Sequence, residues 1–452
     1  MKKLFLMFLL GSVIVSGCNK ILDQSPTSAL DAPTAFTTGP AISAGILGIY
    51  NTFQNAAYYG TDYTLLCDLE ADNLDHTGSY PTYEQVKNRA ITPDNTNTTG
   101  IWNQIYAGIN RCNTIIAAAP TITTGGFDSV GPIAEAKFLR AFFYFDLMRY
   151  FGGTPSGYSD PNGQGVPIVL APTFTAAQAA PHARSSAGAV FAQILSDLGD
   201  AVANIPSSNN FGQANTNAAI ALRARVELYI GQYDAAAADA ETLIGQLGTA
   251  NATGGLDPSY SDLYVSKNVQ PESIFELQFS STNQNGLFFY YYGRDEVATD
   301  ASLQAAYDPA DTRLPVNYFK FDGTIGTSKY DQADGSNDIT LIRLAEVYLT
   351  DAEAVLRGSN PNTAAATIDL NIVRARAGVA PTAAVSVSDL ETAILLENRL
   401  EFPHECHRWF DLRRLGLVVS TFSLADSTKV LWPIPQNEVL TSGNVITQNP
   451  GY

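Results

Sequence analysis

Apolar residues three and four positions apart recur in five long stretches of this chain, and this spacing restricts its fold more than any other feature. Such a stretch forms a helix with one apolar face, and that face must be buried against a neighbouring element. The sequence therefore predicts a mostly helical protein. The five stretches are residues 41–57, 102–119, 133–151, 186–204 and 218–230.

The ends of several stretches carry residues that begin or stop helices. Gly152 and Gly153 follow the third stretch, Pro206 follows the fourth, and Ser185 and Ser186 precede the fourth. Within the third stretch, one face gathers large apolar side chains, and this spacing predicts that they pack in the core. These side chains are Phe138, Phe142, Phe145 and Met148.

Two segments have the pattern of paired helices. Residues 218–240 resemble the tetratricopeptide helix-turn-helix, in which small residues allow the helices to approach closely, and residues 339–356 followed by 362–377 form a second pair. The pairs do not repeat at a fixed period, which argues against a regular solenoid. We expect a mostly α fold in which tetratricopeptide-like pairs form a scaffold with long loops. Short strands are expected at 273–279 and 429–431.

The first residues are typical of a signal peptide. Lys2 and Lys3 precede an apolar run from Leu4 to Val15, which is too short to span a membrane. The segment that ends at Cys18 resembles a lipobox, which predicts cleavage after residue 17 and lipid attachment to Cys18. A plain secretory signal followed by an unmodified cysteine is the alternative.

The composition of the chain limits the kinds of ligand that it is expected to bind. The chain has 26 basic and 44 acidic residues, a net charge of −18, which disfavours nucleic acid as a ligand. Only 15% of residues are charged, and a surface of this kind suits neutral polar ligands such as sugars. Three further thiols, Cys67, Cys112 and Cys406, give no disulfide framework, and a buried, unpaired state is expected for each, although Cys67 and Cys112 could bond.

Loop-rich segments are expected at residues 58–97, 154–184, 254–271 and 278–329, and binding residues concentrate on such loops. The first and last of them combine aromatic rings, which stack on the apolar face of a sugar, with amide, carboxylate and guanidinium groups that bind hydroxyls. Either loop could form one wall of a shallow site. The candidate ligand-binding residues are Asp72, Asn73, Tyr80, Tyr83, Tyr290, Tyr291, Tyr292 and Arg294, together with Trp102 beside the first loop.

Several ordered segments resemble the SusD/RagB family over nearly the whole mature chain. They are AEAKFLRAFFYFDLMRYFGGTP (134–155), ESIFELQFS (272–280), ITLIRLAEVYLTDAEA (339–354) and ENRLEFPHECHRWFDLRRLG (397–416), with LWPIPQNEV and TQNPGY near the end. The chain departs from the family pattern at Pro403 and Cys406, and Pro403 should break a helix there.

The resemblance implies an outer-membrane lipoprotein of Bacteroidetes-type bacteria that faces the cell exterior. It would capture an oligosaccharide or polysaccharide, or in some members a peptide, for a SusC-like TonB-dependent transporter, without catalysis and without a cofactor. It also implies two regions packed as one body, residues 18–270 with the binding loops and residues 271–452, after the signal peptide 1–17. Trp409 and Trp432 lie in scaffold motifs and are expected in the core.

Two other patterns in the sequence could indicate a metal site or glycoside hydrolysis. His404 and His407 are three positions apart, whereas the two histidines of a zinc-protease helix are four positions apart, so no metal site is predicted. Ion pairs that fix this helix to its neighbours are expected instead from Glu405, Arg408, Asp411 and Arg413. Two carboxylate pairs could serve glycoside hydrolysis, but both fall in scaffold motifs, and arginines such as Arg399 are expected to neutralise the second pair. The pairs are Asp351 with Glu353, and Glu397 with Glu401. A pure assembly protein without a ligand is a third possibility.

Overall fold

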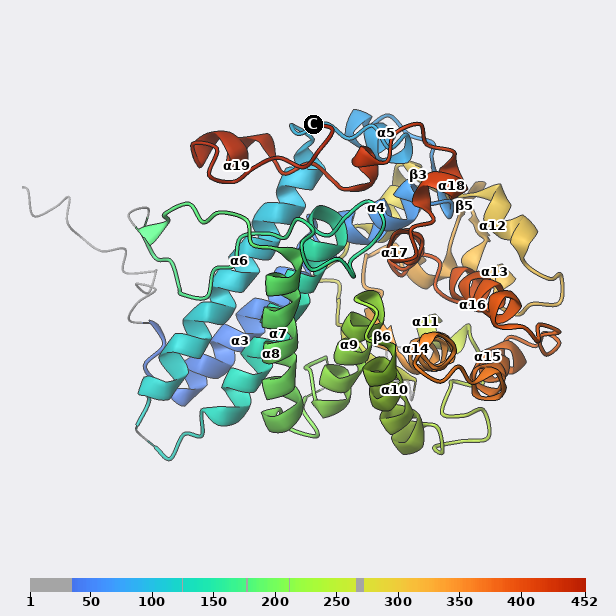
Figure 1. Ribbon diagram of the computed structural model, residues 1–452, viewed down its shortest axis with the longest axis horizontal. Helices are drawn as coiled ribbons and strands as arrows, with labels where there is room; N and C mark the ends of the chain where they lie inside the picture. The colour runs from blue at the N-terminus through green and yellow to red at the C-terminus, as the bar shows by residue number, and fades with distance from the viewer. Residues whose placement is uncertain (1–34, 124, 176–177, 211, 266–271) are drawn as a thin grey trace, which may run out of the picture.

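Long helices packed side by side make up most of the protein. The computed structural model describes residues 35–452 apart from 124, 176–177, 211 and 266–271. Figure 1 shows α3 and α6 on one side, followed by α7 and α8, α9 and α10, and then α14 and α15. The helices are α3 (Gly39–Phe53), α6 (Thr96–Ala118), α7 (Val130–Phe151), α8 (Ala187–Asn204), α9 (Thr216–Tyr229), α10 (Tyr233–Leu247), α14 (Leu344–Arg357), α15 (Thr363–Arg376) and α16 (Val387–Glu401).

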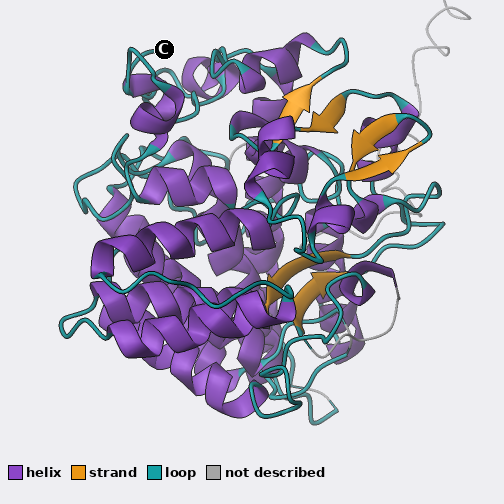
Figure 2. Cartoon of the chain, turned by 90° about the vertical axis from the view of Figure 1, so that its right-hand side faces the viewer, coloured by secondary structure: helices purple, strands orange, loops and turns teal. Residues whose placement is uncertain are grey.

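Shorter elements cover one end and one side of this helical body. The strands form three separate antiparallel pairs, which Figure 2 shows in orange at one side of the helices. The pairs are β1 (Leu74–His76) with β3 (Val297–Thr299), β2 (Ser273–Leu277) with β6 (Ile339–Arg343), and β4 (Phe319–Phe321) with β5 (Thr324–Gly326). The short helices are α4 (Asp62–Glu70), α5 (Pro81–Lys87), α11 (Asp262–Val265), α12 (Ala301–Ala306), α13 (Leu314–Asn317), α17 (Arg408–Arg414), α18 (Val418–Phe422) and α19 (Gln436–Thr441), with single turns η2 (Ala119–Thr121), η4 (Phe289–Gly293), η5 (Ser328–Tyr330) and η6 (Thr428–Val430).

Helix α7 lies at the centre of the core, as its sequence predicts. Phe138, Phe142, Phe145 and Met148 are fully buried. Phe143 and Leu147, outside that face, are buried as well, so the helix has neighbours on every side rather than one apolar stripe. It ends at Gly152, and Gly153 then takes a positive φ that a side chain with a Cβ rarely adopts.

Both predicted helix pairs are present. Helices α9 and α10 pack against each other, as do α14 and α15, and α10 packs on α14. The Asn215 side chain caps α9 and that of Asn362 caps α15, each by accepting a hydrogen bond from a backbone N–H of the first turn. The scaffold of tetratricopeptide-like pairs is therefore confirmed.

Several predicted boundaries were wrong. The helix expected over 339–356 begins only at Leu344, because residues 339–343 pair with β2 as a strand. The strand expected at 429–431 is absent, because residues 429 and 430 belong to the turn η6 and Leu431 follows it. The segment 58–97 contains helices α4 and α5, and 278–329 contains α12, α13 and three strands, so neither is simply a loop. Helix α16 does stop before Pro403, as expected.

The carboxylates of α16 sit in a buried network of charges. Arg313 Nη1 lies 2.7 Å from Glu397 Oε1 and 2.8 Å from Glu401 Oε2, and Glu401 also binds Arg343 and Arg376. Arg399 is not their partner, contrary to expectation, because a residue two positions along a helix points to another face. It binds Asp72 instead.

The segment around the two histidines is not helical, since His404 and Cys406 have positive φ and α17 begins only at Arg408. Three of the four residues predicted to form ion pairs do so: Glu405 binds Arg343 and Lys329, Arg408 binds Asp72, and Asp411 binds Arg414. Arg413 instead donates to the backbone carbonyls of Arg149 and Gly152. No three His, Cys, Asp or Glu side chains come together for a metal among the residues that the structure describes.

The three cysteines Cys67, Cys112 and Cys406 are buried and free. Trp409 and Trp432 are fully buried in the core, as predicted. Within the described part of the chain, every helix is either too short or too polar to cross a bilayer. The predicted signal peptide and Cys18 lie outside the described residues.

Candidate functional site

The two aromatic loops predicted from the sequence meet in the structure. Strand β1 of the first pairs with β3 of the second, with Leu74 opposite Thr299 and His76 opposite Val297. Beyond this pair, the backbone N–H groups of Thr77 and Gly78 both donate to the carbonyl of Glu296 at 3.1 Å. Segments more than 200 residues apart are therefore joined, and their side chains form one surface.

The Glu296 side chain organises this junction. It is buried, and its Oε1 accepts hydrogen bonds from the Ser79 N–H at 2.9 Å and from the Tyr80 N–H. His76 Nε2 lies 3.0 Å from the same oxygen, and Arg294 Nε donates to Oε2 at 3.0 Å. Burial alone would raise the pKa of this carboxyl, but the hydrogen bonds to its charged form lower the pKa below the usual value.

Four side chains at the junction are at least partly exposed, and we call them the aromatic patch: Tyr80, Phe289, Tyr290 and Arg294. The Arg294 guanidinium carbon lies 4.1 Å from the centre of the Tyr80 ring, a cation–π contact. The Tyr80 and Tyr290 rings are 6.1 Å apart, and Phe289, half exposed, meets Tyr290 edge-on at 5.6 Å. The patch thus offers aromatic rings beside a cation that can donate hydrogen bonds.

Tyr83 supports the patch from beneath. Its ring stacks on that of Tyr290, with centroids 5.5 Å apart and planes at 19°, and it is only 1% exposed. Its hydroxyl donates to Asp62 Oδ1 at 2.8 Å, and the other oxygen of Asp62 accepts from Asn97. Tyr83 therefore positions Tyr290 but presents no free ring face.

The three consecutive tyrosines of the second loop point in different directions. They lie in η4, a single π-helical turn, a feature that is often found at functional sites. Tyr290 belongs to the aromatic patch, whereas Tyr291 is fully buried with its hydroxyl 2.8 Å from His404 Nδ1. Tyr292 donates to the Thr327 carbonyl and packs against Phe321, away from the patch.

The remaining predicted residues are occupied by other contacts. Asp72 accepts two hydrogen bonds from Arg408, at 2.8 and 3.0 Å, and despite partial burial these contacts hold the pKa of its carboxyl below the usual value. Asn73 is buried, with its amide donating to Asp68 Oδ1 and accepting from Arg399. Both residues hold the start of β1 in place and have little left to offer a ligand.

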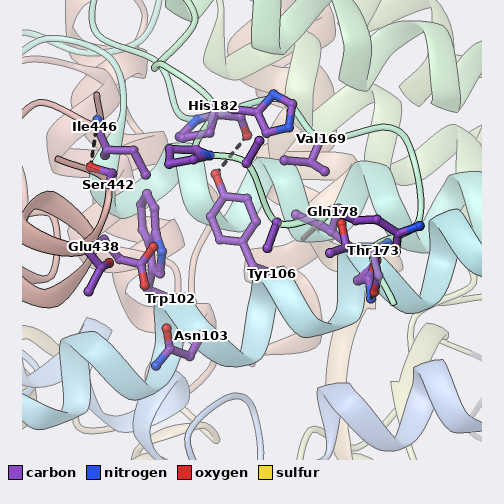
Figure 3. A pocket seen from close by; sticks show the side chains of 17 residues that line it. Trp102, Asn103, Tyr106, Val169, Thr173, Gln178, His182, Glu438, Ser442 and Ile446 are labelled. Carbon is purple, nitrogen blue, oxygen red and sulfur yellow. Dashed lines mark hydrogen bonds between the residues drawn. The ribbon is translucent and has the colours of Figure 1, made fainter. Parts of the chain in front are cut away.

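Trp102 also points inward, at 2% exposed, with its ring 4.9 Å from that of Tyr106 and 5.0 Å from that of Phe151. One edge lines a separate cavity above α6 (Figure 3). Asn73 and Tyr291 are fully buried and Tyr83 and Trp102 are at most 2% exposed, so none of the three rings presents a free face at the aromatic patch. Sequence reasoning missed Phe289 and Glu296, since an apolar ring and one more acid beside a tyrosine run carry no signal of their own.

Two family models match the chain. One, described as the SusD family, matches residues 318–427, and the other, described as starch-binding associating with outer membrane, matches residues 20–228. The chain belongs to the SusD/RagB family. The two matched regions contain most of the scaffold helices, and the first aromatic loop lies within the second model.

Individual SusD/RagB relatives match over nearly their whole length. SusD-like protein P2 of Formosa agariphila is 24% identical, with all of both chains covered. A SusD superfamily protein of Bacteroides thetaiotaomicron has a solved structure with a TM-score of 0.78 and 23% identity, covering 91% of this chain and all of that one. A laminarin binding SusD-like protein has a TM-score of 0.76 and 24% identity, covering 91% of this chain and 99% of that one. At this identity the solved structures establish the fold.

Proposed function

We propose that this protein captures a neutral glycan through the aromatic patch. The observation that carries the proposal is the placing of Tyr80 and Tyr290 beside Arg294 on one exposed surface. Aromatic faces stack on the apolar C–H face of a pyranose, and a guanidinium donates hydrogen bonds to hydroxyl groups. This combination is what a sugar ring requires from a shallow binding surface.

The patch is held in place before any ligand arrives. Glu296 fixes the backbone at Ser79 and Tyr80 and orients Arg294, while Tyr83 fixes the plane of Tyr290. A surface that does not have to be ordered on binding keeps more of its interaction energy as affinity. This pre-organisation supports recognition of a ligand rather than a packing role for the four residues.

The ligand class follows from charge and from relatives. The chain is strongly acidic overall, which disfavours acidic polymers, and the patch carries one cation already bound to Glu296. The laminarin binding neighbour and the starch-binding description of the family support a neutral polysaccharide. A peptide is the alternative ligand, since stacking rings and a guanidinium also suit peptide side chains.

The proposal includes a place in the cell. We propose that Cys18 carries the lipid that anchors the protein to the outer membrane, facing the exterior, and that the captured glycan passes to a SusC-like TonB-dependent transporter. The signal-peptide pattern before Cys18 and the family description that names the outer membrane support this location.

The proposed role is binding without catalysis. A glycosidase needs a carboxylic acid of raised pKa facing a second carboxylate across the sugar. Glu397 and Glu401 are instead buried among arginines, and Glu353 is bound by Arg414 at 2.6 Å. Asp351 is buried on the scaffold helix α14 and belongs to neither aromatic loop.

The test measures how far the purified whole chain is retarded in native gels that contain single polysaccharides. Laminarin, starch and xylan form the neutral panel, and we expect retardation by at least one. Tyr290→Ala should lower the affinity for that polysaccharide by about 1–3 kcal/mol, through loss of one stacking ring. Phe321→Ala is the matched control, because Phe321 is an exposed ring outside the patch. The affinity of this variant for the polysaccharide should equal that of the unmodified chain.

No retardation by any polysaccharide, with saturable binding of peptides instead, would overturn the glycan proposal and favour the peptide alternative. Equal effects of Tyr290→Ala and Phe321→Ala would contradict the assignment to the patch. New reducing ends released from the retained polysaccharide would contradict the non-catalytic role.

A further inference from the structure

A cavity of about 510 Å³ is lined by none of the four residues of the aromatic patch. Its floor is α6, its roof is formed by residues 167–173 and 178–182, and its third side is formed by α19 and the chain up to Ile446. Figure 3 shows Trp102 and Tyr106 rising from α6 toward the segment that carries His182. The volume falls within the range of about 300–1,000 Å³ typical of small-molecule sites.

Hydrogen bonds hold the roof at a fixed height over the floor. Tyr106 donates from its hydroxyl to the Pro167 carbonyl at 2.9 Å. The Asn110 amide both donates to the Thr173 carbonyl, at 2.9 Å, and accepts from the Thr173 N–H, at 2.7 Å. Asn113 of α6 donates to the Val169 carbonyl at 2.9 Å, and the Val169 N–H donates to the Tyr144 hydroxyl of α7 at 2.7 Å. Side chains of α6 therefore hold residues 167–173 at a distance from the helix, and the space between the two stays open.

The third side is also tied to the others. Arg184 donates to the Thr447 carbonyl at 3.1 Å and to Asn449 Oδ1 at 2.8 Å, which joins the end of the roof to the C-terminal segment. The Gln436 N–H, at the start of α19, donates to the Pro93 carbonyl just before α6. All three sides are thus built before any ligand is present.

The lining has an apolar part, drawn from all three sides, and a polar rim. Ile109, Pro167, Val169 and Ile446 are apolar, beside the Trp102 and Tyr106 rings. Asn103 and Glu438 lie on the rim, and neither side chain hydrogen-bonds another residue that the structure describes. Both are therefore available to a ligand.

Charge excludes an anionic ligand. Among the described residues that line the cavity, none is a lysine or arginine, and Glu438 is the single carboxylate. A phosphate or an acidic sugar would meet a negative charge without a permanent positive one. A neutral ligand with an apolar face and several hydroxyl groups fits the divided lining.

We propose that this cavity is a second binding site, separate from the aromatic patch, for one or two neutral sugar units. The apolar face of the sugar packs on the floor around Ile109 and Tyr106, and the hydroxyl groups hydrogen-bond Asn103 and Glu438 at the rim. The ligand class rests on the proposed function, whereas the existence of the site rests on the cavity itself.

The position of the tryptophans allows a direct measurement. Trp409 and Trp432 are fully buried, and Trp102 lines the cavity, so a ligand there changes the fluorescence of one tryptophan of three. The purified whole chain is titrated with maltose, cellobiose and laminaribiose. We expect a saturable change in tryptophan fluorescence with at least one disaccharide.

Thr441→Phe fills the cavity from α19 and should weaken this response at least tenfold. Leu440→Phe is the matched control, because Leu440 is the neighbouring residue, is 63% exposed and does not line the cavity. Its response should equal that of the unmodified chain. Tyr290→Ala should also leave the response unchanged, because Tyr290 belongs to the aromatic patch.

No saturable response to any of the disaccharides, or an equal response from Thr441→Phe, would overturn the second site. Retardation by a polysaccharide that depends on Tyr290 could still be observed in that case, and the proposed function of the aromatic patch would then remain valid without the second site. A response lost in Thr441→Phe without any polysaccharide retardation would support the cavity and overturn the proposed patch.

Discussion

Glu401 shows how much a single buried carboxylate can organise. It lies among Arg313, Arg343 and Arg376, and although burial would raise its pKa, the three guanidinium groups lower it strongly. Each arginine therefore depends on this carboxylate for part of its charge compensation. Because Glu272 and Glu405 share the arginines, the network links β2, β6, α15 and α16 through charge rather than through apolar contact.

Removing one member of such a network should destabilise the protein strongly. Glu401→Ala leaves buried arginines without a partner, and we expect the free energy of unfolding to fall by about 3–5 kcal/mol. Thermal and urea unfolding followed by circular dichroism measure this loss. Glu391→Gln on the same helix is the control, since the pair of Glu391 with Arg357 is partly exposed and contributes less than about 1 kcal/mol. Equal stability of the two variants would contradict the network's importance.

The helix pair α14 and α15 contains two acids on facing helices. Asp351 and Asp369 are both nearly buried. Burial, together with repulsion from Asp369, raises the pKa of Asp351 to about 8, and burial raises the pKa of Asp369 to about 6. The pair is therefore best accommodated with at least one proton, and it opposes helix packing once both carboxyls ionise.

This arrangement predicts that stability falls as the pH rises. Because the pKa of Asp351 is raised in the folded state, its favourable contribution is complete below the unfolded value of about 4 and is lost as the pH passes about 8. Asp351→Asn should therefore melt several degrees above the unmodified chain at pH 9, and the gain should shrink toward pH 5. Differential scanning calorimetry at both pH values measures this. Glu84→Gln, at an exposed position of α5, should leave the pH profile unchanged, and a gain from Asp351→Asn that is independent of pH would contradict the account.

The sequence predicted the elements whose apolar spacing is uninterrupted. The predicted stretches begin and end within a few residues of the observed helices, except that the first turns of α6 were not predicted. These helices are α3, α6, α7, α8 and α9. Helix α4 was not predicted, because buried charged residues interrupt its apolar spacing. Glu70, for example, is fully buried and accepts a hydrogen bond from Trp432 Nε1 at 2.7 Å. Such partners come from distant parts of the chain, so local spacing cannot reveal them.

The candidate site was predicted at the level of segments and less well at the level of side chains. Both aromatic loops were identified, and the structure brings them together at β1 and β3. Tyrosine suits a core and a surface equally, since its ring packs while its hydroxyl finds a partner. Only the fold separates Tyr290, which is partly exposed, from Tyr291, which is buried against His404.

At the scale of the whole molecule, the account requires a membrane anchor. In the proposed function this anchor is a lipid on Cys18, which follows the short apolar run of the predicted signal peptide. Each buried acyl methylene contributes about 0.8 kcal/mol, and several chains hold a folded body at the surface. Under the proposed function, such an anchor would hold the folded body next to its transporter.

Cys18→Ser should remove the anchor without affecting the fold. We expect the variant in the soluble fraction and the unmodified protein in the outer-membrane fraction, as measured by fractionation and immunoblotting. Mass spectrometry of the unmodified protein should find an acylated amino-terminal cysteine. An unacylated amino terminus, or membrane association that persists in Cys18→Ser, would refute the lipid anchor.

The most direct test of the central claim is a crystal structure of the protein with an oligosaccharide cut from whichever polysaccharide retards it in gels. The account predicts a sugar ring in contact with the faces of Tyr80 and Tyr290, with a hydroxyl group within hydrogen-bond distance of Arg294. A bound sugar elsewhere on the molecule, with the aromatic patch bare at saturating ligand, would contradict it.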